Sequence, residues 1–293
     1  MPTEPRPRRS MLYMPGSNPR ALEKARGLAA DALIFDLEDA VSPDAKAAAR
    51  GVIADAVAAG GYGRRELILR TNGLDTAWGH GDLVAAAAMA IHGVLLPKVE
   101  SAATVRQAAS ILDKAGAPAE LAIWCMMETP MGLLHAEEIA ASHPRLAGFV
   151  MGTSDLANDL HARHTSDRLP LLTGLGLCLL AARAYGLAAI DGVYLDLADD
   201  SGFAEACRQG VELGFDGKTL IHPKTIAAAN AAFGPSPAEI AQAQRQIVGF
   251  EAAQAEGKGV VLVDGKLVEN LHVANARRLL ALVARIAELE AGA

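Results

Sequence analysis

One feature limits the fold of this 293-residue chain more than any other. It is a series of eight short apolar runs, each followed by enough chain for a helix. They are continuously apolar rather than alternating, which is typical of parallel strands covered on both faces. Eight strand–helix units on a chain of this length predict an α/β fold, a (β/α)₈ TIM barrel over residues 1–232. The runs cover residues 10–14, 32–37, 66–70, 93–98, 121–127, 148–151, 190–194 and 217–221.

An open doubly wound sheet is the alternative to the barrel. Such a sheet usually has a glycine-rich turn of the form G-x-G-x-x-G after its first strand. Here the first run is followed by Pro15-Gly16-Ser17-Asn18, which does not match that turn. The barrel is therefore the preferred interpretation.

The pattern changes after residue 232, where a cluster of glycine and proline interrupts the alternation. Asp264-Gly265, between two short apolar stretches, is a hairpin signal. We expect a C-terminal extension over residues 233–293 rather than a second full domain. It should contain a helix over 238–256, a hairpin over 260–268 and a last helix from about residue 273.

Composition excludes several classes of protein. The net charge of −7 and a pI near 5.6 argue against a protein that binds nucleic-acid phosphates. The longest apolar stretch is interrupted by charges and glycines, so no transmembrane helix is expected. The three cysteines are widely spaced and form no C-x-x-C pair, so disulfide and zinc sites are not expected. The N-terminus lacks the apolar core of a signal peptide. We expect a cytoplasmic protein.

Charged side chains follow several of the predicted strands. In a TIM barrel the carboxyl ends of the strands meet on one face, where catalytic groups gather. Some of these residues also have structural interpretations: Lys98 as a solvated loop residue, His222 as a loop histidine, Asp36 as a hydrogen-bonding residue inside the barrel. The residues at strand ends are Asp36, Glu38, Asp39, Arg70, Lys98, Glu128, Asp155 and His222.

Glu128 and Asp155 end consecutive runs, so their carboxylates can converge in a barrel. Two carboxylates plus water suit Mg²⁺, which often keeps several water ligands. The alternative is that each acid caps the helix that follows. Asp155 could do so easily, whereas Glu128 is followed by Thr129-Pro130 and is poorly placed for it. We predict a shared metal site.

Seven segments, in order along nearly the whole chain, resemble the motifs of one enzyme family. Through them the chain resembles the CitE-like branch of the HpcH/HpaI aldolase superfamily. Members include citrate lyase β subunits, malyl-CoA, β-methylmalyl-CoA and citramalyl-CoA lyases, and malyl-CoA thioesterases. The segments are SMLYMPGSNPRALEKA (10–25), DALIFDLEDAVSPDAKAAAR (31–50), LRTNGLDT (69–76), GVLLPKVES (93–101), METP (127–130), MGTSDLA (151–157) and FDGKTLIHPKTI (215–226).

The resemblance implies a (β/α)₈ barrel that assembles as a homotrimer or as a hexamer. It implies Mg²⁺, or Mn²⁺ in its place, held by Glu128 and Asp155. It further implies that Arg70 meets carboxylate or carbonyl oxygens of the substrate, with Glu38 and Asp39 in the same site.

Two further regions have roles that only the resemblance implies. Arg20 and Lys24 match basic residues that help to hold the phosphates of coenzyme A. Near the C-terminus, family lyases carry an aspartate that enters the active site of a neighbouring subunit and transfers a proton. Glu269 stands at that position here, and the proline that usually follows is missing. The extra methylene of glutamate could direct the carboxylate toward a water molecule, which leaves cleavage and hydrolysis both open.

The first expectation is a Mg²⁺-dependent lyase that cleaves a 3-hydroxy dicarboxylyl-CoA of the malyl-, methylmalyl- or citramalyl-CoA type. The products would be an acyl-CoA and a small α-keto acid. One alternative is a (3S)-malyl-CoA thioesterase that hydrolyses the thioester. Another is a citrate lyase β subunit that acts on an acyl-carrier thioester within a complex. Neither nucleic acid nor a membrane is expected as a partner.

Overall fold

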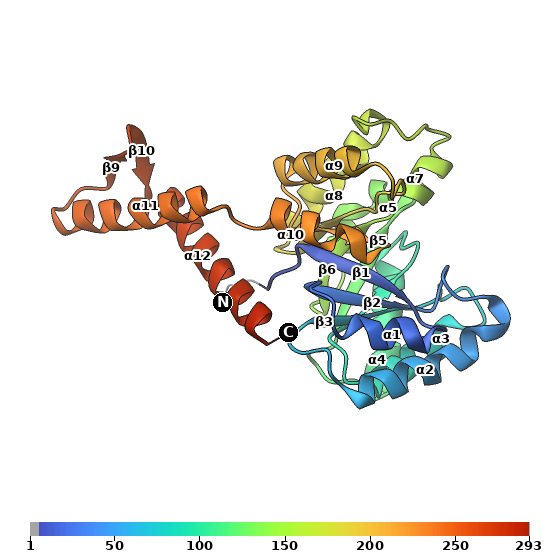
Figure 1. Cartoon of the computed structure of the whole chain (residues 1–293). Helices are drawn as coiled ribbons and strands as arrows, with labels where there is room; N and C mark the ends of the chain where they lie inside the picture. The colour runs from blue at the N-terminus through green and yellow to red at the C-terminus, as the bar shows by residue number, and fades with distance from the viewer. Residues whose placement is uncertain (1–5, 293) are drawn as a thin grey trace. The chain divides into compact units, whose positions relative to one another are not determined.

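The computed structural model describes residues 6–292, which form two compact units: residues 8–232, and residues 6–7 together with 233–292 (Figure 1). In the first unit, eight parallel strands close into a barrel in chain order, and β1 pairs with β8. The predicted (β/α)₈ barrel is therefore confirmed. The strands are β1 (Ser10–Pro15), β2 (Ala32–Asp36), β3 (Glu66–Arg70), β4 (Gly93–Leu96), β5 (Ala122–Met127), β6 (Leu146–Met151), β7 (Ala188–Asp191) and β8 (Gly217–Leu220).

Helices follow the strands and cover the outside of the barrel (Figure 1). Several begin at a side-chain cap followed by proline: Asn18 accepts a hydrogen bond from the N–H of Ala21, and Thr129 accepts one from the N–H of Gly132. The helices are α1 (Pro19–Ala25), α2 (Lys46–Ala59), α3 (Gly79–Ala87), α4 (Ala102–Lys114), α5 (Pro130–Leu134), α6 (Ala136–Ala140), α7 (Thr153–Asp159), α8 (Leu172–Ala184), α9 (Asp200–Leu213) and α10 (Ile226–Phe233).

Apolar side chains fill the middle of the barrel interior. Alternate residues of each strand point inward. They form one buried cluster of Met11, Ala32, Ile34, Ile68, Leu95, Trp124, Met126, Val150 and Ile190. One step of two residues further along some of these strands, the inward side chains are polar. They are Tyr13 on β1, Asp36 on β2, Arg70 on β3 and, just beyond the end of β5, Glu128. Polar side chains thus begin where the apolar filling ends.

The second unit holds α11 (Pro237–Ala255), an antiparallel hairpin of β9 (Val260–Val263) and β10 (Lys266–Glu269), and α12 (Asn270–Ala291). Phe250, Val268 and Val273 form its small core. Positive φ angles at Asp264 and Gly265 give the tight turn expected between the two strands. The last helix begins at Asn270, three residues before the predicted start.

The three cysteines are free and buried, at Cys125 in β5, Cys178 in α8 and Cys207 in α9. Burial raises the pKa of the Cys207 thiol to about 11, and raises the pKa values of Cys125 and Cys178 further still. Across the part of the chain that the structure describes, no helix has both the length and the apolar character needed to pass through a lipid bilayer.

Candidate functional site

A cavity of about 360 Å³ opens at the carboxyl ends of the barrel strands. Its lining combines apolar side chains with acids and one arginine, including Asp36, Asp39, Arg70, Glu128 and Asp155. Of the predicted site residues, Asp39, Arg70, Glu128 and Asp155 therefore border one space. Such a concave site with a few converging polar groups is where small ligands bind.

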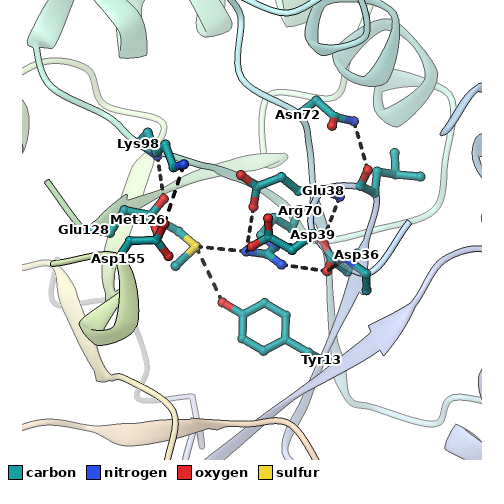
Figure 2. Close-up of polar contacts among 12 residues, drawn as sticks. Tyr13, Asp36, Glu38, Asp39, Arg70, Asn72, Lys98, Met126, Glu128 and Asp155 are labelled. Atoms are coloured by element: carbon teal, nitrogen blue, oxygen red, sulfur yellow. Dashed lines mark hydrogen bonds and ion pairs between the residues drawn. The ribbon is translucent and has the colours of Figure 1, made fainter. Parts of the chain in front are cut away.

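Arg70, at the end of β3, is the centre of the charged cluster (Figure 2). Its Nε and Nη2 donate to the two carboxylate oxygens of Asp36 at 2.7 and 2.6 Å, a bidentate pair. Its Nη1 lies 2.6 Å from Glu38 Oε2 and 3.3 Å from Asp39 Oδ2. Burial alone would lower the pKa of Arg70, but the Asp36 hydrogen bonds and the surrounding acids raise it. Arg70 is thus a fixed positive charge.

Glu38 lies beside Arg70, and its side chain is only 15% exposed. Burial raises its pKa to about 7; Arg70 opposes this rise, whereas Asp39 and Asp36 add to it. A carboxyl group that titrates near neutral pH can both accept and donate a proton under physiological conditions. Glu38 therefore has the properties of a general acid or base.

Glu128 is a deeply buried acid at the cavity, only 2% exposed. Its Oε1 accepts a hydrogen bond of 2.7 Å from the backbone N–H of Lys98. Burial raises the pKa of Glu128 to about 8; the Lys98 N–H opposes the rise, and the charges of Glu38 and Asp155 add to it. Thr129, not Glu128, caps the following helix, so the capping alternative does not apply to Glu128.

Asp155, in the first turn of α7, faces the same cavity. Its Oδ1 lies 3.6 Å from Lys98 Nζ, and both side chains are about half exposed (Figure 2). Gly152 stands at the N-cap of α7, so Asp155 is not the capping residue. Lys98 thus contacts both predicted metal ligands, through its backbone N–H on one side and its ammonium on the other.

The residues present fit a hard divalent cation. Glu128 is a buried acid whose raised pKa shows that its negative charge is poorly compensated. Within residues 6–292 no group of three or more His, Cys, Asp or Glu side chains converges as a metal cage. Mg²⁺ commonly takes one or two carboxylates and completes its shell with water and substrate, so two acids on an open cavity are a suitable donor set.

The structure does not bring every predicted residue to the cavity. Arg20 and Lys24 are exposed on α1, and neither lines the cavity. Glu269 belongs to the other unit, where it ends β10 with an exposed side chain. His222 has a local role: its Nδ1 accepts a hydrogen bond of 3.1 Å from the N–H of Lys224.

Tyr13 is a cavity residue that was not among the predicted site residues. It lies on β1 and lines the cavity next to Arg70. Arg70 lies over its ring, with Cζ 4.8 Å from the ring centroid. The signal was present in the spacing, because Tyr13 comes two residues after the inward-facing Met11. The aromatic ring fits an apolar strand, so the run by itself does not indicate that the hydroxyl lies at a site.

Comparison with known proteins identifies the family. A model of the HpcH/HpaI aldolase/citrate lyase family matches residues 9–223. The chain belongs to this family. The relatives described next are a thioesterase and a lyase, so the chain is an enzyme.

Two curated relatives from Cereibacter sphaeroides match over most of their length. A (3S)-malyl-CoA thioesterase of strain KD131 is 54% identical, over 97% of this chain and 98% of the relative. An L-malyl-CoA/beta-methylmalyl-CoA lyase of strain ATCC 17029 is 35% identical, over 90% and 91% of the two chains. Among solved structures, CitE from Mycobacterium tuberculosis in complex with magnesium, acetoacetate and coenzyme A is 31% identical, with a TM-score of 0.74, and the match covers 94% of this chain and 97% of that one.

Proposed function

We propose that this enzyme hydrolyses the thioester of a 3-hydroxy dicarboxylyl-CoA of the (3S)-malyl-CoA type, releasing the free acid and coenzyme A. The observation that carries the proposal is 54% identity, over nearly the full length of both chains, to a (3S)-malyl-CoA thioesterase. The malyl-CoA lyase relative is much less similar, at 35%. The comparisons thus favour hydrolysis, the alternative in the sequence analysis, over carbon–carbon cleavage, its first choice.

Two groups at the site suit this reaction: Arg70, which lines the cavity, and Glu38, which contacts Arg70. In hydrolysis, the oxygen of water bonds to the thioester carbon, and the carbonyl electron pair moves onto the carbonyl oxygen. When that pair returns, the carbon–sulfur bond breaks and the thiolate takes a proton to become the free thiol. Glu38, with a pKa of about 7, is a base of suitable strength for the proton of the water. Arg70 supplies a fixed positive charge near the oxygen.

We propose Glu128 and Asp155 as the ligands of Mg²⁺, supported by their position on one cavity and by the raised pKa of Glu128. When bound, Mg²⁺ would polarise substrate oxygens as a Lewis acid. Glu128→Ala or Asp155→Ala should abolish Mg²⁺-dependent turnover while the unfolding temperature stays near that of the wild type. Arg20 and Lys24 remain our proposed contacts for the phosphates of coenzyme A.

Carbon–carbon cleavage is the second candidate, favoured by the family and by the 35% identity to a malyl-CoA lyase. In cleavage the 3-hydroxyl loses its proton, the bond to the adjacent carbon breaks, and the electron pair passes onto the thioester carbonyl oxygen as an enolate. Hydrolysis and cleavage therefore both place negative charge on the same oxygen, although their products differ.

One assay separates the two reactions. The enzyme is given (3S)-malyl-CoA and Mg²⁺, and free thiol and glyoxylate are measured in the same sample. Hydrolysis predicts one thiol per substrate consumed and no glyoxylate. Glyoxylate with acetyl-CoA and no thiol would overturn the proposal in favour of cleavage. Turnover of an acyl-carrier thioester but not of malyl-CoA would instead indicate a citrate lyase β subunit.

A further inference from the structure

Two hydrogen-bond donors converge on one sulfur atom on the cavity floor (Figure 2). Tyr13 Oη lies 3.6 Å from Met126 Sδ, and Arg70 Nη1 lies 3.9 Å from the same sulfur. The three side chains come from β1, β5 and β3, and all of them line the cavity. A thioether sulfur is a weak acceptor, so both donors are poorly satisfied there.

The tyrosine is held in place without its hydroxyl group. Its ring packs against the buried cluster inside the barrel, and the Arg70 guanidinium lies over it at 4.8 Å. Among the described residues, the sulfur of Met126 is the one hydrogen-bond partner of Tyr13 Oη. A ligand oxygen beside that sulfur would offer both donors a much stronger acceptor.

Arg70 already has three acidic partners. Its charge is shared with Asp36, Glu38 and Asp39, which contact its three nitrogens at 2.6 to 3.3 Å. Tyr13 has no carboxylate partner, so its hydroxyl is available to add a second hydrogen bond to the same oxygen.

We propose that Tyr13 is a catalytic residue whose hydroxyl, together with Arg70 Nη1, donates a hydrogen bond to the thioester carbonyl oxygen as that oxygen becomes negatively charged. This inference rests on the proposed function only in requiring a CoA thioester in the cavity. It holds for hydrolysis and for cleavage, because both reactions charge the same oxygen.

The phenol stays protonated over the pH range of an assay. Burial raises the pKa of Tyr13 well above its usual value, and the neighbouring Arg70 offsets only part of that rise. The hydroxyl is therefore a donor rather than an acceptor toward an oxyanion. The competing interpretation is structural, namely that the hydroxyl only fills space against Met126.

Tyr13→Phe tests the proposal, because it removes the hydroxyl and keeps the ring beneath Arg70. Tyr62→Phe is a matched control: Tyr62 is buried, has Arg26 over its ring at 5.5 Å, and donates one hydrogen bond of 3.2 Å to Leu22 O, away from the cavity. Both variants are assayed with (3S)-malyl-CoA and Mg²⁺ for kcat and KM, counting total substrate consumed so that either reaction registers. Unfolding temperatures are measured in parallel.

We expect Tyr13→Phe to lower kcat by roughly 10- to 100-fold with KM nearly unchanged, because the bond strengthens only as charge develops. Tyr62→Phe should lower the unfolding temperature more than it lowers kcat. An unchanged kcat in Tyr13→Phe, a loss confined to KM, or a loss that tracks the unfolding temperature would each overturn the proposal. If the wild type yields glyoxylate instead of thiol, the proposed hydrolysis fails while this test remains decisive.

Discussion

The position of Glu128, our proposed metal ligand, depends on the small residue beside it. One of its oxygens is held by the Lys98 N–H, and its side chain lies against Gly152, which follows β6. A Cβ built on Gly152 would approach both Glu128 Cβ and Glu128 Oε2 to 2.3 Å, far inside normal contact. Glycine at this position therefore lets the carboxylate lie where it does.

Replacing Gly152 with alanine should displace Glu128. The φ angle of −97° suits any residue, so the effect comes from the clash and not from backbone strain. We expect the Mg²⁺ concentration for half-maximal activity to rise about 10- to 100-fold, as for other changes that disturb a metal ligand. Activity titrations with Mg²⁺ measure this.

Gly176→Ala, inside α8, is the control for that substitution. A Cβ there meets no atom within 4 Å, so alanine should leave Mg²⁺ dependence unchanged and add up to about 1 kcal/mol of stability. If Gly152→Ala required no more Mg²⁺ than Gly176→Ala, Glu128 would not be a ligand.

At the scale of elements, a buried ion cluster joins β7, β8 and the segment before α8. Asp191, which is 0% exposed, accepts hydrogen bonds of 2.8 Å from Lys218 Nζ and from Arg168 Nη1. Arg168 also donates to Gln209 of α9 at 2.6 Å. These contacts fix the chain between α7 and α8, directly after the helix that carries Asp155.

Asp191→Asn should destabilise the fold at pH 7 by about 3–5 kcal/mol, because Lys218 is then left buried without its partner charge. Burial by itself would raise the pKa of Asp191, but Lys218 and Arg168 lower it below the ordinary value near 3.8. A lowered pKa gives stability that is present above the unfolded value and lost as pH falls through the folded one. The difference in free energy of unfolding between wild type and variant should therefore shrink only below about pH 3.8.

Urea unfolding over a pH series checks this prediction. Glu205→Gln serves as the control, since Glu205 and Arg208 form an exposed pair, and its effect on the free energy of unfolding should be small at every pH. An Asp191→Asn variant no less stable than Glu205→Gln would show that the buried cluster contributes little.

The accuracy of the strand predictions depended on residue type. Runs of Leu, Ile, Val and Met were located well, as in β2 and β5. β7 was not: it begins at Ala188 rather than residue 190 and ends at Asp191 rather than 194. Alanine has a low preference for strands, so the pair that opens β7 gave no signal, while Val193 and Tyr194 gave a false one.

The sequence predicts which residues belong to the site better than it predicts which of them touch. The carboxyl ends of parallel strands share one face, so the acids and Arg70 could be grouped from their order in the chain. Which of them touch depends on the direction of each side chain across the barrel. The bidentate pairing of Asp36 with Arg70, and the approach of Tyr13 to Met126, follow from the closed barrel and not from any local pattern.

At the scale of the whole molecule, we predict that Glu269 completes the active site of another copy. If it does, Glu269→Gln and Arg70→Ala should each be inactive alone, and mixing them after subunit exchange should restore activity. In a head-to-tail assembly about one quarter of the sites would then combine an intact Arg70 with an intact Glu269.

The measurement is the specific activity of the exchanged mixture, with exchange verified by mass spectrometry of tagged chains. Mixing either variant with a doubly substituted chain is the control and should give no recovery. Exchange without recovery in the mixture of single variants would show that each chain works with its own residues.

The burial of the three cysteines has a practical consequence. Their thiols are enclosed and their pKa values are raised, so few thiolates are available to a disulfide reagent while the chain is folded. A colorimetric thiol assay on the native enzyme would then count coenzyme A alone, without a background from the protein. Thiol labelling can also measure opening of the fold. Because the three thiols react only when they are exposed, the rate of their labelling reports how often the barrel opens.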